Sequence, residues 1–116
     1  MLEFNKHLVP TGKVLSFNKF QSLEKLSGTI LDNCFQLNKN HEAACVLENQ
    51  QSKLRFKIFP SNAYPYLQVY TPPHRNSIAI ENLSSAPDAF NNKIGLIILQ
   101  PNEAKAFTTT YQAEYF

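Results

Sequence analysis

The stretch Tyr66-Leu67-Gln68-Val69-Tyr70-Thr71, followed by Ile78-Ala79-Ile80-Glu81, decides the fold of this chain. In a β-strand, successive side chains point to opposite faces of the sheet. Leu67 and Val69 would therefore share one face, while Gln68 would lie on the other face between two tyrosines. Glu81 ends an apolar strand and shares its face only with Ala79, which leaves room for a ligand. A solvated strand end is the ordinary alternative, because glutamate is mostly exposed in proteins.

The rest of the chain shows the same strand pattern. The strand candidates are separated by clusters of Asn, Ser, Pro and Gly, and only residues 20–26 have the apolar spacing of a helical turn. Since no repeat or linker is visible, residues 1–116 are expected to form one all-β domain, an antiparallel β-sandwich. The expected strands cover residues 14–17, 34–37, 43–48, 53–59, 66–70, 78–81, 95–99 and 104–115.

Length and composition limit the classes of function. A chain of 116 residues, 43% of them hydrophobic, suffices for one packed core. Eleven basic and nine acidic residues give a net charge of +2, which is too balanced to indicate a nucleic-acid partner. The alternation of Lys53, Arg55 and Lys57 with apolar residues is typical of a strand with one solvated face. Without a signal peptide or a long apolar run, a cytoplasmic protein with no membrane partner is expected.

Metal, cofactor and nucleophile chemistry find little support in the sequence. His7, His41 and His74 lack the spacing of zinc ligands, so no metal and no cofactor are expected. Cys34 and Cys45 lack C-x-x-C spacing, which favours two free buried thiols over a disulfide. A nucleophilic pair of either cysteine with His41 or His74 has no support in the flanking residues. Carboxylates remain, and a carboxylate can act as a general base.

Six segments of the chain carry a resemblance to a known family. They are Leu8-Val9-Pro10-Thr11-Gly12, Asp32-Asn33-Cys34-Phe35, Gln68-Val69-Tyr70-Thr71, Ile80-Glu81, Pro87-Asp88-Ala89-Phe90-Asn91 and Leu99-Gln100-Pro101-Asn102-Glu103. In this order and at similar spacing, they resemble the C-terminal part of aldose 1-epimerase, also called galactose mutarotase. The resemblance covers nearly the whole chain but only about the last third of a family member. It implies that the domain is part of a galactose mutarotase-like supersandwich, with the sugar pocket on a concave sheet face.

The resemblance also implies roles for three residues. Glu81 matches the catalytic base, which takes the proton from the anomeric hydroxyl of an aldohexose so that the ring can open. Asp32 matches an aspartate that accepts hydrogen bonds from sugar hydroxyls, and Gln68 matches a glutamine beside the sugar in some members. By residue type alone, a loop-capping Asp32 and a solvent-facing Gln68 are the ordinary interpretations. Asp88 is expected to shape the turn after Glu81 rather than to bind substrate.

The sequence departs from the family pattern in two ways. Asn82 follows Glu81, where the family usually has proline or threonine. The family's general-acid histidine, a second histidine and a sugar-binding arginine lie upstream of the matched region, and no histidine of this chain matches them. The chain is therefore expected to be a C-terminal fragment or a truncated product, inactive as a mutarotase on its own.

Two other functions stay open on the sequence alone. One is a carbohydrate-binding β-sandwich remnant without turnover, and the other is a β-sandwich interaction module without a ligand. The sequence does not distinguish a hexose from a hexose phosphate. Because part of a sheet would expose unpaired strand edges, self-association or pairing with a missing N-terminal segment is expected.

Overall fold

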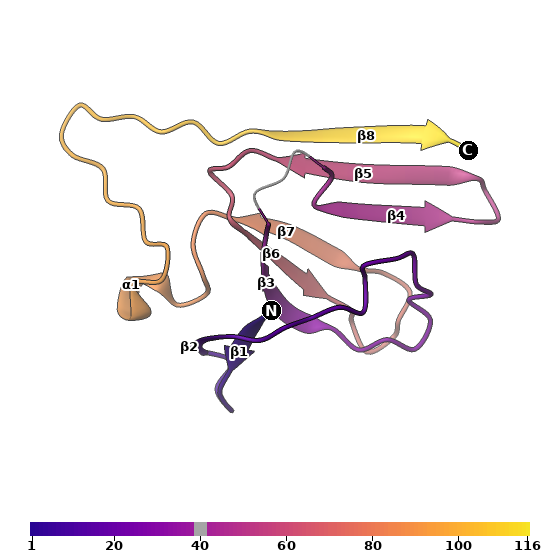
Figure 1. Cartoon of the computed structure of the whole chain (residues 1–116), viewed down its shortest axis with the longest axis horizontal. Coiled ribbons are helices and arrows are strands. Elements are labelled where there is room, and N and C mark those ends of the chain that lie inside the picture. Colours follow the sequence, from indigo (N-terminus) through magenta and orange to yellow (C-terminus); the bar gives the residue numbers. More distant parts are fainter. Residues whose placement is uncertain (39–41) are drawn as a thin grey trace.

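The computed structural model describes residues 1–38 and 42–116, which form an almost entirely β fold (Figure 1). Within these ranges the only helix is the short α1 (Ala89–Asn92), and no helix has the length and apolar character needed to cross a bilayer. The strands are β1 (Leu2–Phe4), β2 (Pro10–Val14), β3 (Asp32–Gln36), β4 (Cys45–Asn49), β5 (Leu54–Pro60), β6 (Tyr66–Tyr70), β7 (Ala79–Leu83) and β8 (Thr109–Tyr115).

The strands form a hairpin, β1-β2, and two three-stranded antiparallel sheets, β3-β6-β7 and β4-β5-β8. Strand β6 is the centre of its sheet, because it pairs along its whole length with β3 on one side and with β7 on the other. The strand predicted at residues 66–70 is confirmed. Since residues directly opposite in an antiparallel pair point to the same face, this register decides which side chains lie together.

One face of β3-β6-β7, here called the inner face, packs toward the second sheet. Leu67 and Val69 of β6 form a buried cluster with Leu31, which directly precedes β3. Cys45 of β4 packs against this cluster from the other sheet. Two layers of antiparallel strands thus enclose an apolar core, and the predicted β-sandwich is confirmed.

The opposite face of β3-β6-β7, here called the site face, is covered over one part of its area. Cys34 and Tyr66 on this face form a second buried cluster with Leu2 of β1 and with Ala86, which follows β7. Gly95 closes the cluster at a φ of +72°, where an added Cβ would lie 3.0 Å from Cε2 of Tyr66. The β1-β2 hairpin therefore shields the apolar part of the face, and the polar part beside it stays uncovered.

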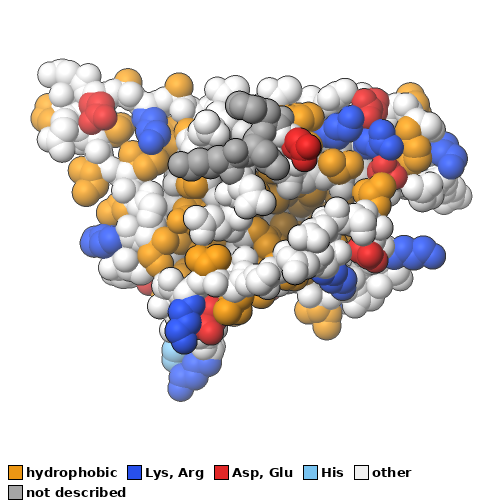
Figure 2. Space-filling view, viewed as in Figure 1, with side chains coloured by type: hydrophobic (Ala, Val, Ile, Leu, Met, Phe, Trp, Pro, Cys, Tyr) orange, Lys and Arg blue, Asp and Glu red, His pale blue; other side chains and the backbone are white. Residues whose placement is uncertain are grey.

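The outward face of β4-β5-β8 carries a network of ion pairs, and charged side chains gather over this sheet in Figure 2. Arg55 contacts Glu48 (2.6 Å) and Glu114 (3.1 Å), and Lys57 contacts Glu114 (2.7 Å). Hydrogen bonds from Lys57 and Arg55 lower the pKa of Glu114. The solvated strand face predicted for Arg55 and Lys57 is confirmed, while Lys53 lies in the turn before β5.

Two predicted elements are wrong. Residues 95–99 are not a strand, since Gly95 lies in a turn and the segment continues into the long excursion that leads to β8 (Figure 1). No neighbouring strand in the described chain bonds to its backbone, and a β-strand exists only through such pairing. Residues 20–26 form no helix, because one turn cannot repay the cost of helix nucleation.

The other differences concern strand ends. Strand β8 begins at Thr109, not at residue 104, because its partner β5 ends at Pro60, opposite Thr109. The strand predicted at 14–17 lies instead at Pro10–Val14, where it pairs with the unpredicted β1. The strands predicted at 34–37, 43–48, 53–59 and 78–81 are confirmed with ends that differ by at most two residues.

Gly95 provides a test of the packing under the site face. Gly95→Ala would combine a left-handed backbone with a contact of 3.0 Å to Tyr66. Gly28→Ala is the matched control, because Gly28 has the same φ of +72° and nothing within 4 Å of an added Cβ. We expect Gly95→Ala to lower the free energy of unfolding by about 1–3 kcal/mol more than the control, measured by urea denaturation. Equal losses would contradict the described packing.

Candidate functional site

The structure places Asp32, Gln68 and Glu81 together on the site face of β3-β6-β7. Gln68 of β6 lies directly opposite Glu81 of β7 on one side and opposite Cys34 of β3 on the other. Asp32 is two residues before Cys34 on β3, so its side chain points to the same face. Side chains separated by up to 49 positions in sequence are therefore neighbours on one surface.

A direct hydrogen bond joins two of these residues. Nε2 of Gln68 donates to Oδ1 of Asp32 over 3.0 Å, which fixes the orientation of the Gln68 amide. The other end of the amide, Oε1, is buried and has no hydrogen-bond partner among the described residues. A buried acceptor without a donor costs about 1–3 kcal/mol, and Oδ1 of Asn82 on the inner face is likewise buried without a partner among the described residues.

Glu81 lies on an edge strand and is exposed to solvent. In the described part of the chain its carboxylate makes no hydrogen bond and no ion pair. Its oxygens are therefore free to accept a proton or a hydrogen bond from a ligand that contacts the Gln68 amide at the same time. Two carboxylates and an amide on one surface can bind a polyol, because together they offer several acceptors and few donors.

The cysteines do not supply a nucleophile. Cys34 is completely buried on the covered part of the site face, and desolvation raises the pKa of its thiol to about 11, although the N-terminal ammonium group of Met1 opposes this shift. Burial also raises the pKa of Cys45, which packs against the inner face. A protonated thiol is a poor nucleophile, so Cys34 serves as packing for the strand that carries Asp32. Both cysteines are free.

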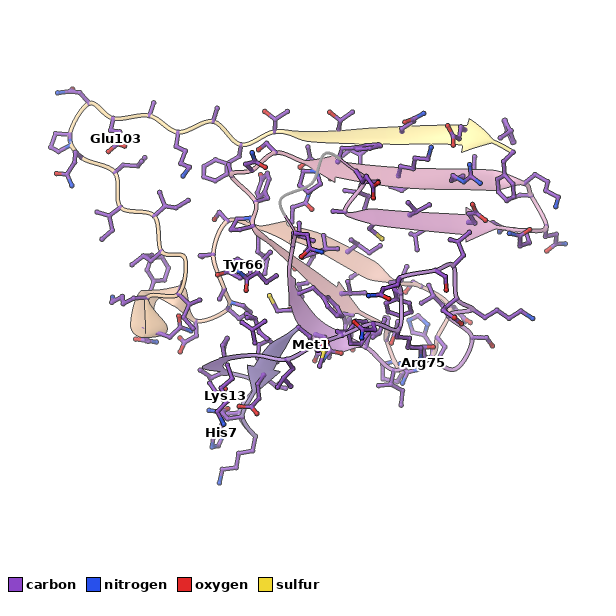
Figure 3. The ribbon with its side chains drawn as sticks, viewed as in Figure 1. Met1, His7, Lys13, Tyr66, Arg75 and Glu103 are labelled. Atoms are coloured by element: carbon purple, nitrogen blue, oxygen red, sulfur yellow. The ribbon has the colours of Figure 1, made fainter. Side chains whose placement is uncertain are left out.

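The histidines are not close partners of Glu81 in the described chain. His7 lies at the tip of the β1-β2 hairpin, which projects away from the sheet (Figure 3). His74 lies on the loop between β6 and β7, where its Nδ1 accepts a hydrogen bond from the backbone N–H of Asn76 (3.0 Å). His41, considered above as a partner for either cysteine, lies outside the described residues. No group of three potential metal ligands occurs in residues 1–38 and 42–116.

Two positioning residues were missed by the sequence analysis. Thr71 is buried. Its hydroxyl accepts a hydrogen bond from the backbone N–H of Leu31 (2.8 Å) and donates one to the backbone carbonyl of Thr29 (3.0 Å). These two bonds fix the position of the segment that leads into β3 at Asp32. Asn82 continues β7 beyond Glu81, and its Nδ2 donates to Oγ1 of Thr109 on β8 (2.8 Å). Their only signal in the sequence is a polar residue at an inner-face position of an apolar strand.

The bond between Asp32 and Gln68 can be tested without a ligand. Asp32→Ala removes the acceptor of the Gln68 amide, so the side-chain N–H resonances of Gln68 should shift and exchange faster with water in a ¹H–¹⁵N spectrum. The side-chain amide of Asn82, which bonds to Thr109 on the other face, serves as the internal control and should not move. Unchanged Gln68 resonances in the variant would contradict the described site.

Comparison with known proteins identifies the family of the chain. A search of curated proteins found no match. The family model described as aldose 1-epimerase matches residues 1–112 of the 116 residues, a range that includes Asp32, Gln68 and Glu81. The match covers the β1-β2 hairpin and the sheet β3-β6-β7 completely, and it ends within β8 of the second sheet. The chain therefore belongs to the aldose 1-epimerase family.

Proposed function

We propose that this chain forms the base-bearing part of a mutarotase site, which interconverts the α and β anomers of an aldohexose. The observation that carries the proposal is the convergence of Asp32, Gln68 and Glu81 on one sheet face, where Glu81 is exposed to solvent. Membership of the aldose 1-epimerase family supports a sugar as the ligand. The proposal assigns the chain to the C-terminal third of a complete enzyme, as one β domain in the cytoplasm.

Each of the three residues has a distinct role in this proposal. Glu81 takes the proton from the anomeric hydroxyl as the bond between C1 and the ring oxygen breaks, and an acid delivers a proton to that ring oxygen. Rotation about the C1–C2 bond and the reverse proton transfers then give the other anomer. Asp32 and Gln68 accept hydrogen bonds from other hydroxyls of the sugar, and they keep the ring in place while C1 reacts.

The acid is the part of the site that this chain does not supply. The described histidines make no contact with Glu81, and the described cysteine thiols are buried or half-buried with raised pKa values. We infer that the acid comes from an upstream segment of the complete enzyme, which would cover the polar part of the site face. A carbohydrate-binding remnant without turnover is the alternative, and the same experiment distinguishes the two.

An uncovered apolar surface supports the inference of a covering segment. On the face of β4-β5-β8 that looks toward the other sheet, Tyr111 and Tyr115 are 61% and 82% exposed. Phe56 stacks on Tyr111 with the ring centroids 5.7 Å apart, yet nothing in the described chain covers the pair from the open side. Figure 2 shows hydrophobic side chains in the hollow below this sheet. Either an upstream segment or a second copy of the chain would bury such a surface.

Polarimetry of freshly dissolved α-glucose or α-galactose tests the proposed function. The isolated chain should not accelerate mutarotation, because a positioned acid contributes a factor of about 10²–10⁴. Adding the upstream segment in trans should restore activity, and Glu81→Gln in this complex should lower turnover by about 10² or more. Glu103→Gln is the matched control, since Glu103 is an exposed carboxylate far from the site (Figure 3).

Two results would contradict the proposed function. Full activity of the isolated chain would require an acid within it. A near-normal rate of Glu81→Gln in the complemented enzyme would remove Glu81 from the mechanism. Sugar binding with no turnover in the complex would favour the carbohydrate-binding remnant.

A further inference from the structure

A cavity of about 240 Å³ opens at the end of the sheet where β3 begins and β6 ends. Its wall comes from two segments that are far apart in sequence, residues 26–29 before β3 and residues 71–78 between β6 and β7. The volume lies below the about 300–1,000 Å³ of pockets for drug-sized molecules, so the cavity suits a small ligand. Six of the eight lining residues have polar side chains, although most of the surface exposed to the cavity is apolar, and these six are Ser27, Thr29, Thr71, Arg75, Asn76 and Ser77.

The cavity is separate from the surface assigned to the sugar. Its two apolar lining residues, Leu26 and Ile78, pack against the buried cluster of the inner face. Gln68 and Glu81 project from the site face, on the other side of the same sheet. Figure 3 places Arg75 on the loop beyond the end of β6. A ligand in the cavity would therefore not occupy the position next to Glu81.

Arg75 is held in a geometry that leaves one edge of its guanidinium group free. Its Nη1 donates to the backbone carbonyls of Thr71 and Pro72, which uses both hydrogens of that nitrogen. Nε and Nη2 have no partner among the described residues. These two nitrogens form the parallel pair of donors that fits the two oxygens of a carboxylate or a phosphate group. Because the group is already tethered, binding would cost little side-chain entropy.

A second cation lies at the same wall. Nζ of Lys19 is 3.5 Å from Oγ1 of Thr29, one of the lining residues. In residues 1–38 and 42–116, neither Lys19 nor Arg75 lies within ion-pair distance of a carboxylate. The hydroxyl of Thr71 bonds to Leu31 and Thr29 and so ties the two wall segments together. The cavity thus has one positive charge in its lining, that of Arg75, and a second cation, Lys19, beside the lining residue Thr29.

We propose that this cavity binds a small oxyanion, a phosphate or a carboxylate group, through the free Nε and Nη2 edge of Arg75. Lys19 adds a second positive charge at the rim, and the hydroxyls and amide of Ser27, Ser77 and Asn76 offer further donors. The inference does not depend on the mutarotase proposal, because the residues of the cavity and those of the site face are different.

Titration of the whole 116-residue chain tests the proposal. Inorganic phosphate and sodium acetate are added in separate series at constant ionic strength, and binding is followed by ¹H–¹⁵N spectra. Glucose is the neutral comparison. We expect saturable shifts of the amides of residues 26–29 and 71–78 with at least one of the two anions and none there with glucose. Equal shifts with glucose, or no saturable shifts with either anion, would overturn the proposal.

Variants separate a specific site from general attraction to a basic protein. Arg75→Gln should weaken anion binding at least tenfold, and Arg75→Lys should weaken it too, since lysine keeps the charge but lacks the paired donors. Lys13→Gln is the control, because Lys13 is an exposed cation on the β1-β2 hairpin (Figure 3) and its loss should leave binding unchanged. Equal losses in Arg75→Gln and Lys13→Gln would overturn the proposal.

Arg75 bonds to the backbone of its own loop, so its replacement could also unfold that loop. A third variant therefore distinguishes the loss of anion binding from a folding defect. Ser77→Asp places a negative charge in the lining without removing the bonds of Arg75. It should abolish anion binding while the thermal unfolding midpoint stays close to that of the parent chain. Anion binding of normal strength in a folded Ser77→Asp variant would contradict the assignment of the ligand to this cavity.

Discussion

The register of β6 between β3 and β7 is the constraint on which the rest of the structure depends. The side-chain period of a strand is two, so a slip of one residue would move Gln68 to the inner face and Leu67 or Val69 to the outside. Two features hold the register. The apolar cluster of Leu67, Val69 and Leu31 requires the inner face, and the buried hydroxyl of Thr71 ties the start of β3 to the end of β6.

The same sheet serves two purposes because its faces differ so strongly. The inner face supplies the core that holds the two layers together, so its side chains are closely packed. On the other face, the carboxylate of Asp32 orients the amide of Gln68 through a hydrogen bond of 3.0 Å. Glu81 lies opposite that amide on an edge strand, where a ligand can reach it.

Much of this arrangement could be predicted from the sequence. The alternation in residues 66–70 predicted β6 and its two faces, because period two needs no knowledge of the partner strands. Strand alternation also singled out Glu81 as a carboxylate at a strand end, but its role and its association with Asp32 came from the resemblance to the family, since no local pattern links two residues 49 positions apart. Residues 95–99 have the composition of a strand. A strand also needs a hydrogen-bonded partner strand, and the local sequence does not show whether a partner lies beside it. The structural role of Thr71 was missed for a related reason. That role depends on hydrogen bonds to Leu31 and Thr29, about 40 positions away in the sequence.

The most direct measurement for this account is the set of interstrand nuclear Overhauser effects of β6 in the isotope-labelled chain. We expect backbone contacts from Gln68 to Cys34 on one side and to Glu81 on the other, together with slow amide exchange along β6. Contacts that instead pair Gln68 with Asn33 or with Asn82 would shift the register by one residue. Pairing with Asn33 would put Asp32 on the face opposite to Gln68, and pairing with Asn82 would do the same to Glu81. In either case the described site would not exist.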